Sequence, residues 1–475
     1  MKLVLVTGCF NVLHPGHLRL LRFAKECGDR LIVAVQSDCL AGNAAHVHEH
    51  LRLEGVQSIA WVDEAFIYDK SLDTLITRLR PDVMVKGKEH ELCFNPEAAV
   101  LEQYGGALVF SSGETIFSSL DFIRKEFKTG DFHSISLPHE YLLRHQIKPA
   151  RLIELLQQFS RLKLCVVGDL IVDEYITCDP LGMSHEDPTI VVTPIDSTRF
   201  VGGAGIVAAH AAGLGASVQF VSVTGNDAAR DFALEGLAAT EVEAQLFVDG
   251  SRPTTLKQRY RSKGKSLLRV SHLHQGAIST ALQTQLLTAL EQALDGADLL
   301  VFSDFNYGCL PQPLVDKLVA IAKSRGVLLA ADSQSSSQVG DISRFKGMDL
   351  ITPTEREARI STRNREDGLV VLAEQLRQQS TAYNVLLKLG EEGLLIHAGN
   401  GKADDWLTDR VNALNNGPKD VAGAGDSLLI TSAMTLACGG TIWEAACLGS
   451  LAAAVQVGRV GNIPLRTEEL LRELS

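Results

Sequence analysis

The sequence predicts an α/β protein with two unlike domains, a smaller Rossmann-like domain followed by a larger α/β domain. The chain has 475 residues, which is enough for two or three domains. Short apolar strands alternate with helical segments in both halves, a pattern typical of parallel sheets covered on both faces. The glycine-rich turns of the two halves differ in sequence, so we expect no internal repeat.

The first domain is predicted over residues 1–130. Its strands are expected at 2–8, 29–38, 81–87 and 105–112, and its helices at 15–28, 49–59, 71–80 and 118–127. The next segment, 131–158, is polar and mixed in pattern, and we interpret it as a linker.

The second domain is predicted over residues 159–475. Its strands are expected at 161–169, 218–225, 297–304, 326–332, 348–354 and 384–390. Most of these runs are continuously apolar, which is typical of strands buried on both faces of a sheet.

Composition excludes several classes of protein. A net charge of −12 argues against a surface that coats nucleic acid. No run of about 18 uncharged apolar residues is present, so we expect no membrane partner. The first apolar run is too short for a signal peptide. Nine cysteines without a CxxC pair fit reduced thiols in a cytoplasmic protein.

The densest chemical motif of the first half is TGCFNVLHPGH, Thr7 to His17, between a strand and a helix. Gly8 lets the chain turn off the strand, and Gly16 leaves room for a ligand. His14 and His17 stand at a helix N-terminus, where free amides and the helix dipole favour phosphate. The pattern predicts that both imidazoles stabilise charge on a phosphoryl group. The alternative is that each is an ordinary surface or core histidine.

The second half carries DVAGAGDSLL, Asp420 to Leu429, where a glycine-rich loop enters a helix. The backbone amides around Gly423, Ala424 and Gly425 can form an anion hole. The carboxylate of Asp426 would accept a hydroxyl proton beside it. The alternative is a glycine-rich turn with a capping Asp.

Two other glycine motifs accompany this loop. Gly202 and Gly203 open a helix, and LGEEG, with Gly390 and Gly393, closes a strand in a turn suited to a nucleotide.

The first motif resembles the cytidylyltransferase-like superfamily, whose signature is GxFDxxHxGH, over about residues 1–128. Its nearest variant is the adenylyltransferase domain of the bifunctional enzymes of ADP-heptose synthesis. The resemblance implies that a sugar phosphate attacks the α-phosphorus of ATP or CTP and that pyrophosphate leaves. It gives catalytic roles to His14 and His17. It implies nucleotide contacts at Gly8, Cys9, Phe10, Gly16, Arg52, Lys86, Ser118 and Ser119.

Two departures concern this domain. Asn11 replaces the Asp of the signature, and the lysines usual after the second strand are missing. A pyrophosphate leaving group gains from such cations, so turnover is expected to be weak unless Arg52 or Lys88 compensates. The tract around His46, His48 and His50 is interpreted as a solvated loop.

The second half resembles the ribokinase-like sugar kinases over about residues 160–475, and within them the heptose-7-phosphate kinases. The matching segments are GDLIVDEY, MSHEDP, TLKQRYR, SDFNYG and ITPTERE. The resemblance implies that Asp426 is the base, that Glu357 helps to organise Mg²⁺, and that ATP is the phosphate donor. It places Asp173, Gly202 and Gly203 against the sugar.

Three basic residues, Lys257, Arg259 and Arg269, are candidates for the phosphate of the sugar. The alternative is an exposed basic strand. The family's Asn after GGAA is Ile206 here, and the Asn of its NxxE motif is Thr354. The Lys of its DPKG segment is missing from ADSQSS, residues 331–336. These changes favour an altered sugar over an inactive enzyme.

Together, the two resemblances predict a bifunctional enzyme of nucleotide-sugar synthesis with its domains in the reverse of the usual order. The expected ligands are a sugar phosphate, heptose first, and a nucleotide, and the expected assembly is a homodimer. Two alternatives stay open. One is a sugar kinase whose N-terminal domain is catalytically weak, senses nucleotide or drives oligomerisation. The other is a non-catalytic sensor.

Overall fold

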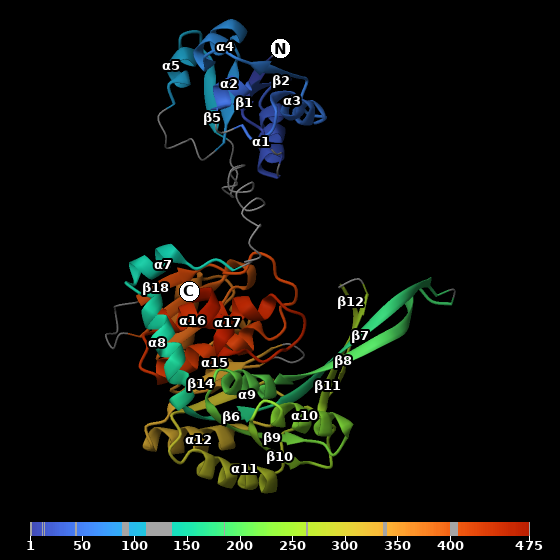
Figure 1. Cartoon of the computed structure of the whole chain (residues 1–475), viewed down its shortest axis with the longest axis vertical. Helices are drawn as coiled ribbons and strands as arrows, with labels where there is room; N and C mark the ends of the chain where they lie inside the picture. The colour runs from blue at the N-terminus through green and yellow to red at the C-terminus, as the bar shows by residue number, and fades with distance from the viewer. Residues whose placement is uncertain are drawn as a thin grey trace. The chain divides into compact units, whose positions relative to one another are not determined.

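The computed structural model forms two compact units, Met1–His133 and Ser134–Ser475 (Figure 1). It describes residues 2–11, 13, 15–42, 45–87, 95–110, 135–184, 186–262, 265–335, 340–399 and 407–474. No helix in this described part is both long and apolar enough to span a bilayer.

The first unit is a five-stranded parallel sheet in the order β3-β2-β1-β4-β5. Its strands are β1 (Leu3–Gly8), β2 (Arg30–Gln36), β3 (Glu64–Tyr68), β4 (Val83–Lys86) and β5 (Ala107–Phe110). Its helices are α1 (Pro15–Glu26), α2 (Asp38–Ala41), α3 (Glu49–Gln57), α4 (Leu72–Leu79) and α5 (Glu97–Glu102).

Alternation along β1 fills a core on each face of this sheet. Val4 and Val6 pack in one apolar cluster, whereas Leu5 between them packs in the other. The predicted Rossmann-like fold is confirmed. The strand β3 and the helix α5 were not predicted, and the helix expected at 118–127 lies outside the described residues.

The second unit is built on a nine-stranded sheet in the order β10-β9-β6-β13-β14-β15-β16-β17-β18. The strands are β6 (Lys163–Gly168), β9 (Ser217–Thr224), β10 (Glu243–Val248), β13 (Leu299–Asp304), β14 (Leu328–Ser333), β15 (Leu350–Ile351), β16 (Asn384–Lys388), β17 (Leu394–Ala398) and β18 (Leu407–Val411). All neighbours are parallel except β16 with β17 and β17 with β18.

Helices cover both faces of this sheet. One apolar cluster includes α9 (Ala204–Gly213), α10 (Ala228–Ala238), α15 (Ala424–Ala437), α16 (Ile442–Val457) and α17 (Thr467–Leu474). The other includes α11 (Thr280–Ala293), α12 (Gln312–Ser324), α13 (Glu355–Thr362) and α14 (Leu369–Ser380). The predicted ribokinase-like α/β architecture is confirmed.

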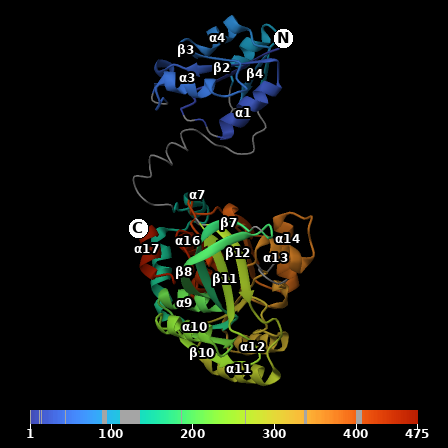
Figure 2. The same cartoon turned by 90° about the vertical axis from the view of Figure 1, so that its right-hand side faces the viewer.

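A second, four-stranded sheet, which we call the lid, leaves the main sheet with strand order β12-β11-β7-β8 (Figures 1 and 2). Its strands are β7 (Leu170–Met183), β8 (Ile190–Gly203), β11 (Thr255–Ser262) and β12 (Lys265–His272). The first half of β7 is buried, and most of the rest is exposed. The lid therefore has a root inside the unit and an outer half in solvent.

The segment expected as a linker is folded for most of its length. It contains α7 (His139–Arg144) and α8 (Pro149–Gln158). Tyr141, Leu142 and Leu152 are buried in the core of the second unit, and the Tyr141 hydroxyl donates to the Trp443 carbonyl at 2.8 Å. The second compact unit thus begins at Ser134 rather than at 159.

Candidate active sites

The end of β1 forms the first candidate site. Phe10 adopts a left-handed conformation with φ 53°, so the chain turns sharply after the strand. The ring of His17, in the first turn of α1, lies 5.1 Å from the Phe10 ring. Asn11 is buried, and its Oδ1 accepts from the amides of His46 and Val47 at 2.9 and 3.4 Å.

This turn brings several predicted residues together. Gly8 lies against the Phe10 ring, because a Cβ added to this glycine would stand 3.1 Å from it. Asn11, which stands where the family has an aspartate, has a structural role, because it anchors the segment before α3. His14, Ser118 and Ser119 lie outside the described residues, as do the side-chain surroundings of Gly16.

Arg52 on α3 is completely buried, in contrast to the phosphate contact expected of it. Its guanidinium donates to the Val47 carbonyl at 2.7 Å, to the Cys9 carbonyl at 2.6 Å and to the Asp38 carboxylate. The hydrogen bond from Arg52 holds the pKa of Asp38 below its usual value, although burial opposes it. Arg52 therefore ties three segments of the unit together, and its charge is already paired.

Lys86 at the end of β4 is paired in the same way. Its ammonium contacts the buried carboxylate of Glu97 and donates to Asn95 Oδ1 at 2.7 Å. By contrast, His46, His48 and His50 are exposed, as expected of a solvated segment.

The second candidate site lies at the start of α15. Gly423 adopts φ 75° and lets the loop enter the helix at Ala424, so the amides of the first turn point at one place. Asp426 in that turn is buried, and Gln334 donates to its Oδ1 at 3.1 Å. Burial, followed by the charge of Asp332, raises the pKa of Asp426 to about 7. Such a carboxyl is suited to act as a general base near neutral pH.

Asp173 on β7 faces the same region from the lid. It is buried, and a Cβ on Gly202 would lie 2.4 Å from its Oδ2, so only glycine fits there. Asn462, which sequence reasoning missed, donates to Asp173 Oδ2 at 3.1 Å. Burial raises the pKa of Asp173, although Arg259 and Lys257 oppose the rise.

The predicted basic residues share one face of the lid, because alternate residues of a strand point the same way. Lys257 pairs with Asp173 in the register of β11 and β7, and its ammonium lies about 5 Å from the rings of Phe305 and Tyr307. Arg259 lies 3.8 Å from Asp173 Oδ1. Arg269 is exposed on β12, directly across from Arg259.

The lid is tied to the loop before α15. The Tyr175 hydroxyl donates to Asp420 Oδ2 at 2.8 Å, and the amide of Gly461 donates to the same oxygen at 3.1 Å. Asp420, the first residue of the glycine-rich motif, therefore links the lid to the loop.

Asp169 holds the base of the lid. Its carboxylate accepts from the backbone amides of Phe305, Tyr307 and Cys309 at 2.8 to 3.2 Å. Burial and the neighbouring Asp304 nevertheless raise the pKa of Asp169 to about 6.

Glu357 has a role different from direct metal binding. Its carboxylate accepts from the amides of Thr354 and Ser335, at 2.8 and 2.9 Å, and closes a capping box on α13. No group of three or more residues suited to hold a metal occurs in the part of the chain that the structure describes.

The LGEEG turn lies beside the site. Gly390 and Gly393 have φ of 63° and 92°, and a Cβ on Gly393 would stand 2.1 Å from the Val411 carbonyl. An open cleft of about 1070 Å³ runs from this turn along α13. Its basic lining residues are Arg356, Arg359, Arg363, Arg365 and Lys388.

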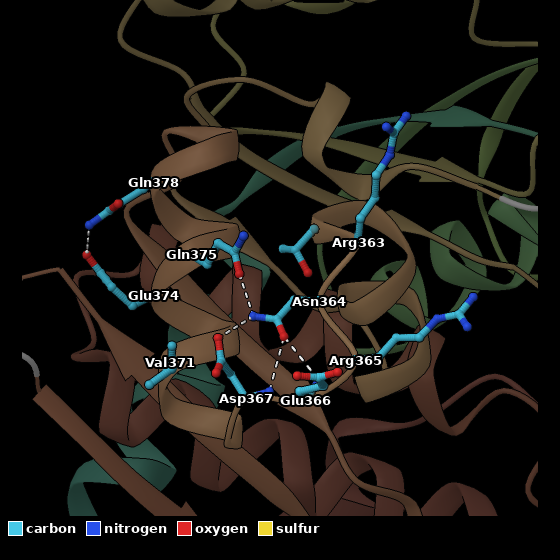
Figure 3. A pocket seen from close by; sticks show the side chains of 10 residues that line it. Arg363, Asn364, Arg365, Glu366, Asp367, Val371, Glu374, Gln375 and Gln378 are labelled. Atoms are coloured by element: carbon cyan, nitrogen blue, oxygen red, sulfur yellow. Dashed lines mark hydrogen bonds between the residues drawn. The ribbon is translucent and has the colours of Figure 1, made fainter.

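A second hollow, of about 720 Å³, lies at the far end of α13 and along α14 (Figure 3). Asn364 spans it, donating to Asp367 at 2.8 Å and to Gln375 at 2.7 Å. None of the predicted site residues lines this hollow.

Comparisons with known proteins agree with the two-unit architecture. A model of the cytidylyltransferase-like family matches residues 5–106, and one of the pfkB family of carbohydrate kinases matches residues 161–468. The bifunctional protein HldE of Paramagnetospirillum magneticum is 29% identical over 324 residues, 67% of this chain and 64% of that protein. HldE of Helicobacter hepaticus is 31% identical over 317 residues, 65% of this chain and 63% of that protein. The chain thus spans less than two thirds of the length of these relatives.

Solved structures support the fold of the second unit. A carbohydrate kinase from Agrobacterium tumefaciens matches 66% of this chain and 97% of its own, with 21% identity and a TM-score of 0.51. Phosphofructokinase-2 from Escherichia coli, solved with substrates and products, matches 66% of this chain and 98% of its own, with 17% identity and a TM-score of 0.53. Since the kinase model also spans more than half of the sequence, the chain belongs to the pfkB family of carbohydrate kinases.

Proposed function

We propose that the chain is a bifunctional enzyme of nucleotide-sugar synthesis. The second unit would phosphorylate a sugar phosphate with ATP, heptose 7-phosphate being the leading substrate. The first unit would transfer a nucleotidyl group from ATP or CTP to a sugar 1-phosphate, which forms from the kinase product only after a separate phosphatase removes the 7-phosphate. The observation that carries the proposal is Asp426, buried at the start of α15 with a pKa near 7. The similarity to the HldE proteins supports the choice of heptose.

In the kinase reaction, the sugar hydroxyl oxygen attacks the γ-phosphorus of ATP and ADP leaves. Asp426 takes the hydroxyl proton, and the amides of Ala424 and Gly425 donate to the phosphoryl oxygens. Asp173 and Asn462 would orient the sugar, and Lys257, Arg259 and Arg269 would receive its phosphate.

Magnesium is the second part of this proposal. The phosphates of ATP and water would supply the oxygen ligands that Mg²⁺ prefers, and Glu357 would act indirectly by holding the segment before α13 in place. The ion would neutralise phosphate charge during transfer.

In the transferase reaction, a sugar 1-phosphate oxygen attacks the α-phosphorus of the nucleotide, and pyrophosphate leaves. His14 and His17 would stabilise the charge that develops there. The pairing of Arg52 with Asp38 and of Lys86 with Glu97 favours a second candidate for this unit, a weak or nucleotide-sensing domain.

A homodimer is proposed from the outer half of the lid. Five large apolar side chains there are 41 to 68% exposed: Leu181, Met183, Ile190, Val191 and Ile195. A group of exposed large apolar side chains is typical of protein interfaces. A second copy of the lid would cover it, and sedimentation of the purified chain would reveal the mass of the dimer.

We place the enzyme in the cytoplasm, which agrees with the free thiols of the described cysteines.

The test of both activities is one assay with two readouts. The purified chain is given ATP, Mg²⁺ and a panel of sugar phosphates, and ADP and pyrophosphate are measured separately. Release of both products supports the bifunctional enzyme, and ADP alone supports the kinase with a sensing domain. Release of neither with any sugar would overturn the proposal.

His17→Ala sharpens the transferase assignment. Because His17 would act on charge in the transition state, pyrophosphate release should fall on the order of a hundredfold, with nucleotide affinity changed far less. ADP release should stay as in the wild type. His50→Ala, an exposed histidine of the same unit, is the matched control.

Asn11→Asp tests whether this unit is a weakened transferase. The carboxylate would still accept from the His46 and Val47 amides, so the local fold is expected to hold. Faster pyrophosphate release would mark a weakened transferase. If neither form releases pyrophosphate although both bind ATP by calorimetry, the unit is a nucleotide sensor.

A further inference from the structure

Lys388, the last residue of β16, is a buried cation that the predicted mechanism leaves unused. Its side chain is 13% exposed, and its Nζ lies 3.0 Å from both carboxylate oxygens of Asp332 on β14. The neighbouring position 334, where the sequence departs from its family by lacking a lysine, is occupied by the neutral Gln334. The positive charge near this carboxylate therefore comes from a different strand.

The ammonium of Lys388 lies against the start of α15. A Cβ added to Gly425 would stand 3.2 Å from Lys388 Nζ, so this amine and the amides of the anion hole border the same space. Gln334 reaches Asp426 in the same region with a hydrogen bond of 3.1 Å. Lys388 thus lies where a phosphoryl group held by the loop would be, beside the proposed base.

The charges around this amine are mostly negative. The carboxylate of Asp332 is in direct contact with it, and those of Glu357 and Asp426 lie near enough to act on it electrostatically. Without it, a phosphoryl group entering the loop would meet these carboxylates with less positive charge beside it to offset their repulsion.

The same side chain is open to a ligand. Lys388 lines the inner end of the basic cleft beside Gly390, the turn suited to a nucleotide. A polyphosphate lying in this cleft would have its end between Lys388 and the amides of Gly425 and Asp426. Lys388 therefore borders both the cleft and the first turn of α15.

We propose that Lys388 is a catalytic residue of the kinase, and that its ammonium contacts the phosphoryl group under transfer. This inference rests on the proposed kinase function. As the bond from the γ-phosphorus to its bridging oxygen breaks, ADP keeps the electron pair and the new bond forms to the sugar oxygen. The proton of the sugar hydroxyl goes to Asp426, and Lys388 remains protonated throughout. Its fixed charge stabilises the phosphoryl oxygens and the leaving ADP.

The main test is Lys388→Met, which keeps much of the length of the side chain and removes the charge. The expected result is a fall in kcat for ADP release of at least about a hundredfold, with a smaller change in the KM for ATP. Lys388→Arg should retain part of the activity. Lys317→Met, at an exposed lysine of α12, should behave as the wild type. A folded Lys388→Met enzyme with kcat within about threefold of the wild type would overturn the proposal.

Two further variants separate catalysis from folding. Lys388→Met leaves Asp332 buried without its partner, which can destabilise the fold, so Asp332→Asn is combined with it to remove both charges. Gln334→Lys in the Lys388→Met enzyme returns a cation from the neighbouring strand and should recover activity at least tenfold. An unchanged rate in the double neutral variant, relative to Asp332→Asn alone, would show a purely structural role.

Failure of the kinase proposal can be told apart from failure of this one. If the wild type releases no ADP with any sugar, the kinase function fails, and Lys388 is then judged by binding. Inorganic tripolyphosphate, titrated by calorimetry, should bind the wild type about tenfold more tightly than Lys388→Met. Equal binding in that case would overturn the proposed phosphate contact.

Discussion

The two units use their positive charges in opposite ways. In the first unit, Arg52 and Lys86 are bound to the carboxylates of Asp38 and Glu97 and hold segments of the fold together. In the second unit, Lys257 and Arg259 lie on a sheet face beside Asp173, next to the proposed base. The paired basic residues of the first unit therefore join segments of the fold, whereas those of the second unit stand beside the proposed base. This difference favours a competent kinase joined to a weaker transferase.

Truncation tests whether the units are as separable as this comparison requires. A fragment 134–475 should keep full kinase activity. A fragment 155–475 should fail to fold, because it loses Tyr141, Leu142, Ile147 and Leu152 from the core. Each buried side chain of this kind contributes about 1.5–3 kcal/mol. Circular dichroism and ADP release provide the measurements. If 134–475 is folded but inactive, the kinase depends on the first unit and the comparison fails.

Asp426→Asn should lower kinase turnover at least about a hundredfold while pyrophosphate release is unchanged, because the amide cannot accept the hydroxyl proton. In the wild type, kcat/KM for the sugar should rise with pH through an apparent pKa of about 7, since the base must be deprotonated. Asp231→Asn, at an exposed position of α10, is the control. Near wild-type ADP release by Asp426→Asn would refute its assignment as the base.

Arg52→Met should destabilise the first unit without affecting the kinase. It leaves the carbonyls of Cys9 and Val47 without their donor, which costs about 1–3 kcal/mol for buried polar groups. Thermal unfolding of the fragment 1–133 measures the effect, with the exposed Arg22→Met as control. If Arg52→Met instead keeps its stability and loses nucleotide binding, Arg52 is a ligand contact after all.

Asn462→Ala should have the smallest effect. It removes the hydrogen bond to Asp173, so the KM for the sugar should rise by up to about tenfold with little change in kcat. Asn364→Ala, in the hollow of Figure 3, removes hydrogen bonds to Asp367 and Gln375, neither of which is a predicted site residue, and should leave this KM unchanged. Equal KM values for both variants would exclude Asn462 from the sugar site.

The fold and the two glycine-rich turns could be predicted because short stretches of sequence determine them. Strands such as β6 and β13 are continuous apolar runs, and Gly423 to Asp426 has one plausible geometry between a loop and a helix. The helix α7 was missed because six residues are too few to show a helical period.

The side-chain arrangement could not be predicted in the same way. Asn462 lies 289 residues from Asp173 in the sequence, so only tertiary structure brings them together. The direction in which a charged side chain points also cannot be read from the neighbouring sequence. Arg52 was expected to face phosphate, yet it is enclosed by Cys9, Asp38 and Val47.

The junction between β6 and β7 is short and tightly packed, so the lid is rigidly attached to the main sheet. Only Asp169 separates β6 from the lid, and the Asp169 carbonyl also accepts from the amide of Ala204, where the chain returns from β8 into α9, at 3.0 Å. A Cβ on Gly168 would stand 1.8 Å from the Ser303 carbonyl, so the backbone at this junction is packed tightly against β13. Any movement of the lid relative to the main sheet would therefore require its strands to bend, since the backbone at Gly168 and Asp169 is fixed by contacts with β13 and α9.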